Sequence, residues 1–155
     1  MVHQDGFLCL TWQLIGGLST RERLASWGVT DTLVCPLCNV ANETIDHLFF
    51  SCVYSSGIWN ILLQWQGLTR KTMSWQHEMA WMEVNERGRS ARAEVSRMAI
   101  AGCVYHIWQE RNMRIFQNKQ RQEEQVIRQI IQEIFCRGSM WARLAKKLER
   151  LNFYP

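Results

Sequence analysis

The sequence lacks the features of disordered, secreted and membrane-spanning chains. Only two of its 155 residues are proline and 47% are hydrophobic, so a folded core is expected. No uninterrupted apolar run approaches the ~20 residues that cross a bilayer, and the start lacks the basic and apolar regions of a signal peptide. We therefore expect a protein of the nucleus or cytoplasm, in a reducing compartment and without membrane contact.

Catalytic patterns and strong charge of either sign are also missing. No Ser-His-Asp arrangement, glycine-rich phosphate loop or inward-facing carboxylate pair emerges from the sequence. We therefore expect no enzymatic activity. The formal net charge of +4 at pH 7 permits contact with nucleic acid without requiring it.

Cysteine and histidine cluster in the first third of the chain. The segment CPLCNVANETIDHLFFSC reads Cys35-x2-Cys38-x8-His47-x4-Cys52. Two cysteines separated by two residues can bind one cation, because the turn between them offers backbone N–H groups to the thiolates. Four ligands fill a tetrahedron and leave no open position for water. The expected cofactor is therefore one structural zinc ion.

Other interpretations of the cysteines are weaker. Buried free cysteines beside a core histidine are common, but here a CxxC pair and a His-x4-Cys pair coincide in the pattern of a metal site. A redox CxxC would begin a helix after a strand, whereas Cys38 precedes a polar loop. Cys103 and His106 could bind a second metal, but without two further ligands nearby a buried core pair is favoured.

Hydrophobic spacing and capping residues predict short helices in residues 1–90. The first helix is expected to start at a capping box formed by Ser19 and Glu22, and the second at Asn42 or Glu43, ahead of His47. The third is expected to start at Ser55 or Ser56, and the fourth at Ser74. Gly28 and Gly67 are expected to end the first and third of these helices.

Two long helices are expected from about residue 91 to about 116 and from about 122 to Gly138. A last segment sets Trp141, Leu144, Leu148 and Leu151 opposite Arg143, Lys146, Lys147 and Arg150. The expected fold is mostly α: a small CCHC zinc module of short helices packed on the pair of long helices, with a C-terminal amphipathic basic helix. The expected domains are a zinc-binding module at residues 1–67 and a helical region at residues 68–155.

The residues around the metal pattern resemble a known family. Besides the four ligands, the matching residues are Trp12, the run from Gly17 to Leu24, Trp27, Gly28, Pro36, Leu37, Glu43, Thr44, the run from Leu48 to Phe50, and Trp59. They resemble the zinc-binding domain at the C-terminal end of plant non-LTR retrotransposon reverse transcriptases. The run from Ile107 to Asn112, with Phe116, resembles the motif that follows this domain, so the resemblance covers roughly residues 7 to 135.

The resemblance implies that Cys35, Cys38, His47 and Cys52 bind zinc and that the domain helps to hold a nucleic-acid template. Polymerase and ribonuclease H domains do not appear in these 155 residues, so we expect a stand-alone module that does not perform reverse transcription. The expected partners are RNA or DNA. The alternative is a protein–protein interaction module recruited into a host complex.

Five basic residues are the candidates for nucleic-acid contact: Arg21, Arg23, Arg111, Lys146 and Lys147. Arginine and lysine contacts to phosphates supply most non-specific affinity for nucleic acid. The competing interpretation is a set of solvated helix faces. The eight tryptophans could stack on bases, but packing in the core is favoured because several stand at apolar positions of helical patterns.

Overall fold

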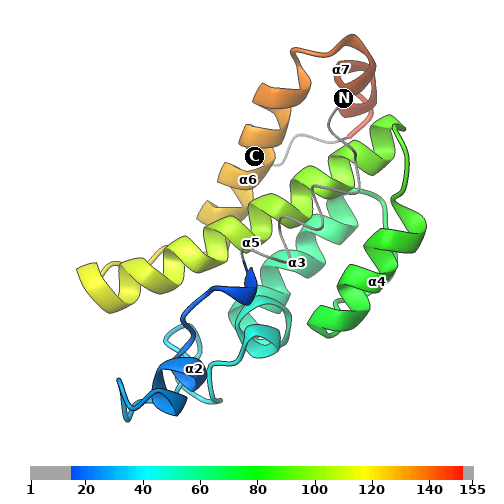
Figure 1. Cartoon of the computed structure of the whole chain (residues 1–155). Helices are drawn as coiled ribbons and strands as arrows, with labels where there is room; N and C mark the ends of the chain where they lie inside the picture. Colours follow the sequence, from blue (N-terminus) through cyan, green and yellow to red (C-terminus); the bar gives the residue numbers. More distant parts are fainter. Residues whose placement is uncertain (1–14, 152–155) are drawn as a thin grey trace.

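The computed structural model describes residues 15–151, and these residues are mostly helical (Figure 1). The elements in chain order are α2 (Arg21–Ser26), the π-helix η1 (His47–Ser51), α3 (Val53–Trp65), α4 (Trp75–Asn85), α5 (Ala91–Gln117), α6 (Glu123–Gly138) and α7 (Ala142–Leu148). Within the described residues the β-pairing is limited to one isolated bridge between Val34 and Asn42. The mostly α fold predicted from the sequence is confirmed, whereas Trp12 and the rest of residues 1–14 lie outside the described part.

The 27-residue helix α5 is the central helix, and α3, α6 and α7 pack against it (Figure 1). The core between these helices contains Trp59, Ile107 and Ile130, each no more than 1% exposed. Gly102 permits the close approach of α5 to α6, since a Cβ at this position would lie 3.1 Å from Ile130 Cγ2. The two long helices expected from the hydrophobic spacing are therefore paired as predicted.

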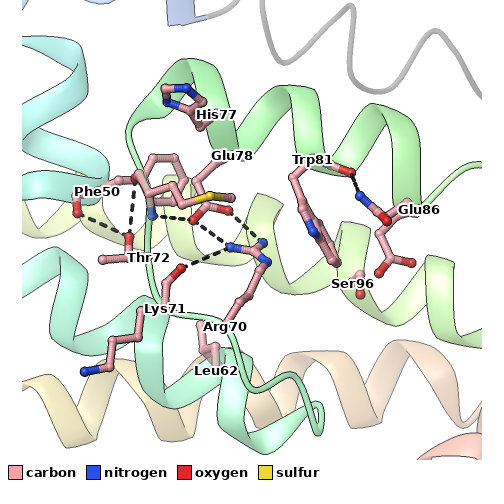
Figure 2. Close-up of polar contacts among 12 residues, drawn as sticks. Phe50, Leu62, Arg70, Lys71, Thr72, His77, Glu78, Trp81, Glu86 and Ser96 are labelled. Carbon is pink, nitrogen blue, oxygen red and sulfur yellow. Dashed lines mark hydrogen bonds and ion pairs between the residues drawn. The ribbon is translucent and has the colours of Figure 1, made fainter.

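A buried ion pair joins helix α4 to the segment that leads into it. Arg70 donates from both terminal nitrogens to the Glu78 carboxylate, at 2.9 and 2.8 Å, and the Glu78 side chain is fully buried. The backbone N–H of Met73 donates to the same carboxylate at 2.8 Å, and the Arg70 guanidinium lies 4.0 Å from the centre of the Trp81 ring. Figure 2 shows Arg70, on the segment that leads into α4, beside Glu78 of α4.

The predicted helix ends are mostly confirmed. Gly28 and Gly67 have φ angles of 71° and 82°, in the left-handed region that glycine adopts at helix ends. Ser74 caps α4, because its hydroxyl accepts a hydrogen bond from the His77 N–H. Asn118, with φ of 51°, ends α5 in the same left-handed way.

The predicted starts of α2 and α3 were wrong. Helix α2 begins after Thr20 and has no Ser19 capping box, because the Glu43 carboxylate accepts the Arg21 N–H at 2.7 Å. A residue from a later part of the chain thus replaces the local cap. Helix α3 begins at Val53, ahead of the predicted starts at Ser55 and Ser56, because Cys52 is its N-cap.

Helix α7 is amphipathic, as predicted, but its apolar side contains fewer residues than the sequence predicted. Leu144 and Leu148 are buried, and Leu151 packs against the core. Trp141 is instead 67% exposed. Within residues 15–151, no helix combines the length and the apolar character that a bilayer crossing requires.

Candidate metal centre

The first two ligands stand on a short turn between Cys35 and Cys38. The isolated bridge between Val34 and Asn42 closes this loop. The Asn39 N–H donates to the Cys35 carbonyl at 2.8 Å, and Asn39 adopts φ of 56°, a conformation that asparagine tolerates better than most residues. The turn therefore holds the two cysteines by backbone bonds rather than by packing alone.

The other two ligands stand at the ends of the π-helix η1. The Cys52 N–H donates to the His47 carbonyl at 2.6 Å, across five residues, which is the hydrogen-bond pattern of a π-helix. This wider turn brings residues five apart together and accounts for the His-x4-Cys spacing. The helical residues begin at Ile45, after the predicted Asn42 or Glu43, and the Thr44 hydroxyl accepts the His47 N–H at 3.0 Å.

The four ligand atoms converge on one point. Cys35, Cys38, His47 and Cys52 each offer an atom within 4.8 Å of the other three. The Cys35 and Cys52 sulfurs are 4.0 Å apart, and the Cys38 sulfur is 3.3 Å from His47 Nε2. A tetrahedral zinc site with bonds of about 2.0–2.3 Å has ligand–ligand edges of roughly 3.5–3.8 Å. The geometry and the donor set both fit a single zinc ion.

The electrostatics of the two buried sulfurs also fit a cation. The hydrogen bond with Cys52, followed by burial, raises the pKa of the Cys35 thiol, although backbone N–H groups of Cys38 and Leu37 lower it. The same bond with Cys35 lowers the pKa of Cys52. Two thiolates at this separation would repel each other, which favours a cation between the sulfurs. A zinc ion would allow all three cysteines to bind as thiolates, and the four ligands would leave no position for a catalytic water.

A buried ion pair joins α5 to the metal loop, which we define as residues 34–46, the segment that carries Cys35 and Cys38 and leads into η1. Glu43 is fully buried, and Arg111 donates to its two carboxylate oxygens at 3.0 and 2.8 Å. Because the same carboxylate accepts the Arg21 N–H, one side chain connects α2, the metal loop and α5. The sequence offered no local signal for this pair, since the two residues are 68 positions apart.

A second arginine of α5 supports the CxxC turn directly. Arg114 donates to the Leu37 carbonyl at 2.9 Å and to the Glu110 carboxylate at 3.1 Å. Its guanidinium lies 4.7 Å from the centre of the Tyr54 ring. The Tyr54 hydroxyl in turn donates to the Arg121 carbonyl at 2.9 Å. The turn between the first two ligands is therefore attached to α5 and to the segment that follows it.

The predicted nucleic-acid contacts do not form one surface. Arg21 and Arg23 are half-buried on the metal side, where each donates to backbone carbonyls. The Arg111 side chain is only 5% exposed and is engaged by Glu43, so its guanidinium faces the interior. Lys146 and Lys147 lie on α7, at the opposite end of the molecule from α2 (Figure 1).

Cys103 and His106 are both 1% exposed and belong to the interior of the helical region. His106 Nε2 lies 3.0 Å from the Glu133 carboxylate. Within the described residues, the group that could hold a metal contains neither of these side chains. The arrangement agrees with the preferred interpretation of a core pair.

Comparison with known proteins identifies the segment that carries the metal site. Residues 5–59 match the family model described as zinc-binding in reverse transcriptase. The match contains all four ligands and includes no catalytic domain. Searches of curated proteins and of solved structures returned no match. The family match and the converging ligands together support a zinc-binding module of the reverse transcriptase type.

Proposed function

We propose that this chain is a nucleic-acid-binding zinc module, derived from a plant retrotransposon reverse transcriptase and acting alone without catalytic activity. One observation carries the proposal: the segment that matches the family of zinc-binding domains in reverse transcriptases also contains the four side chains that converge as a closed metal centre. A closed centre holds the shape of a binding surface and does no chemistry of its own. The proposed partner is RNA or DNA, in the nucleus or the cytoplasm.

The charge distribution near the metal supports this proposal. Arg21 and Arg23 present guanidinium groups at the surface of the zinc module, with positions fixed by backbone carbonyls. Each arginine has five N–H donors, so bonds to carbonyls leave others for a phosphate. The net charge of +4 favours association with a polyanion.

The test is the salt dependence of binding to a labelled single-stranded RNA and its DNA equivalent, followed by fluorescence anisotropy. The observed association constant should fall steeply with rising salt, because bound phosphates release counterions. Replacing Arg21 and Arg23 by alanine should weaken binding about tenfold or more at ~0.1 M salt. Arg137→Ala, at an exposed position near the end of α6, is the matched control. Absence of binding at low salt would remove the proposal.

Because both arginines also bond to the backbone, the double variant needs a structural control. Its thermal unfolding and zinc content should be compared with those of the unmodified chain. If binding is lost while stability and zinc content stay unchanged, the arginines act on the ligand rather than on the fold.

Exposed apolar residues favour a second candidate, the protein–protein interaction module. Trp27, Val29 and Val40 are 62%, 67% and 85% exposed on the zinc module. Exposed apolar groups of this size occur in protein interfaces. This candidate predicts that pull-down from plant extract recovers a stoichiometric protein partner that survives nuclease treatment. A chain that remains alone and monomeric in the same extract would contradict it.

A further inference from the structure

A polar pocket of about 610 Å³ lies between the metal loop and the turn that follows α5. Six polar side chains line it: Arg21, Asn39, Arg114, Asn118, Lys119 and Gln120. The remaining lining residues are Pro36 and Ile115, so no carboxylate faces the pocket. Its volume falls in the range of roughly 300–1,000 Å³ that is usual for small-ligand sites.

The two arginines of the pocket are held in place before any ligand arrives. Arg21 donates to the Val34 carbonyl, and Arg114 donates to the Leu37 carbonyl and to Glu110. Fixed guanidinium groups lose less entropy when they bind an anion than free side chains do. Their remaining N–H donors are available to the pocket.

Lys119 and the amides supply the other donors. Lys119 is exposed, and its side chain makes no ion pair within residues 15–151. Asn39 and Asn118 occupy left-handed turns on the two sides of the pocket, with φ of 56° and 51°. An amide NH₂ group carries two N–H donors, and together with the cations it suits an anionic ligand.

Nearby negative charges do not cancel this character. The Glu110 side chain is fully buried and is paired with both Arg114 and Arg121. A zinc centre with three thiolates carries one net negative charge, and the C-terminal end of α5 adds a partial one. The side chains that line the pocket include three cations and no carboxylate, so the formal charge of the lining is positive.

We propose that this pocket binds a phosphate group of a nucleic-acid strand, with Lys119, Arg21 and Arg114 as the cationic contacts. The inference rests on the proposed function and extends it, since it assigns the strand to the metal side of the molecule rather than to α7. A nucleic-acid strand and a free nucleotide both carry the phosphate that the pocket would bind. The experiment therefore tests both ligands.

Lys119→Gln is the decisive variant, because its side chain is exposed and its removal leaves the packed structure intact. The variant should weaken oligonucleotide binding about three- to tenfold at ~0.1 M salt and reduce the salt slope by roughly 0.7–0.9, the loss of one phosphate contact. Lys71→Gln, at an exposed position in the segment that leads into α4, is the matched control and should leave both quantities unchanged. A mononucleotide and inorganic phosphate form the second arm, tested as competitors.

A protection measurement locates the contact independently of affinity. Acetylation of Lys119 should slow when the oligonucleotide is present, whereas acetylation of the exposed Lys71 should not. If the chain binds oligonucleotide with a steep salt dependence but Lys119→Gln matches the unmodified chain, the pocket proposal is overturned and the proposed function stands. If a mononucleotide protects Lys119 and no oligonucleotide binds, the strand is excluded as the source and the proposed function fails as well.

Discussion

The Glu43–Arg111 pair provides the sharpest test of how the zinc module is held together. Both side chains are at least 95% buried, and the contact is bidentate. Replacing Arg111 by methionine removes the cation and leaves an uncompensated buried carboxylate. Breaking a buried pair in this way costs roughly 3–5 kcal/mol, a large share of the ~5–15 kcal/mol that stabilises a typical domain.

A matched control and a second substitution isolate the cause. Arg87→Met removes the exposed pair with Glu83 and should cost less than about 1 kcal/mol. Adding Glu43→Gln to Arg111→Met removes the stranded charge while keeping an oxygen for the Arg21 N–H. The double variant should therefore recover about half of the loss or more.

The assay is urea unfolding in excess zinc, followed by tryptophan fluorescence and far-ultraviolet circular dichroism. An Arg111→Met variant whose free energy of unfolding stays within about 0.5 kcal/mol of the unmodified chain would refute this reasoning. A variant of unchanged stability that loses nucleic-acid affinity would instead support the sequence-based prediction that Arg111 contacts the ligand.

Three further substitutions test the metal and the buried charges. Cys35→Ser should abolish the binding of one zinc ion per chain, as measured by metal analysis. The loss of binding free energy, on the order of 10 kcal/mol, should unfold the module. A variant that stays folded and loaded with zinc would contradict this prediction. Arg70→Met should lower the free energy of unfolding by about 3–5 kcal/mol, because it leaves Glu78 buried and unpaired (Figure 2). Urea unfolding measures this loss, and amide hydrogen exchange should accelerate most in α4. Unchanged unfolding and exchange would contradict the prediction. Burial raises the pKa of Glu86 above its usual 4.5, so ionisation destabilises the folded state as pH rises through that raised value. Glu86→Gln should therefore raise the midpoint of thermal unfolding near pH 7, and this gain should disappear toward pH 4. A gain independent of pH would contradict this cause.

The sequence predicted those features that depend on neighbouring residues. The CxxC turn, the His-x4-Cys pair and the Ser74 cap are local patterns, and each forms as expected. The long helices follow from hydrophobic spacing, which depends only on helix geometry.

Most of the features that were missed depend on distant contacts. Glu43 caps α2 and pairs with Arg111 on α5, and neither role leaves a trace within a few residues of Glu43. The burial of Arg111 against Glu43 was missed for the same reason, and its contact with nucleic acid stays a prediction. The π-helix was also missed, because the four-residue spacing between His47 and Cys52 does not by itself distinguish a wide turn from a break after a helix.

These distant contacts bear on the division after residue 67, which stays a prediction. The family match ends at Trp59, inside α3, yet α3 packs against α5 and α6. In a fragment of residues 1–67, buried side chains such as Leu62 and Leu63 would lose their partners, at about 1.5–3 kcal/mol each.

Glu43 would lose its cation in the same fragment. We therefore expect residues 1–67 with zinc to give a poorly dispersed amide NMR spectrum, whereas residues 1–138, which retain α5 and α6, should give a dispersed one. The comparison controls for zinc, since both fragments contain all four ligands. A well-dispersed spectrum from the shorter fragment would mean that the metal alone organises the module and that the arginines of α5 only attach it to the helices.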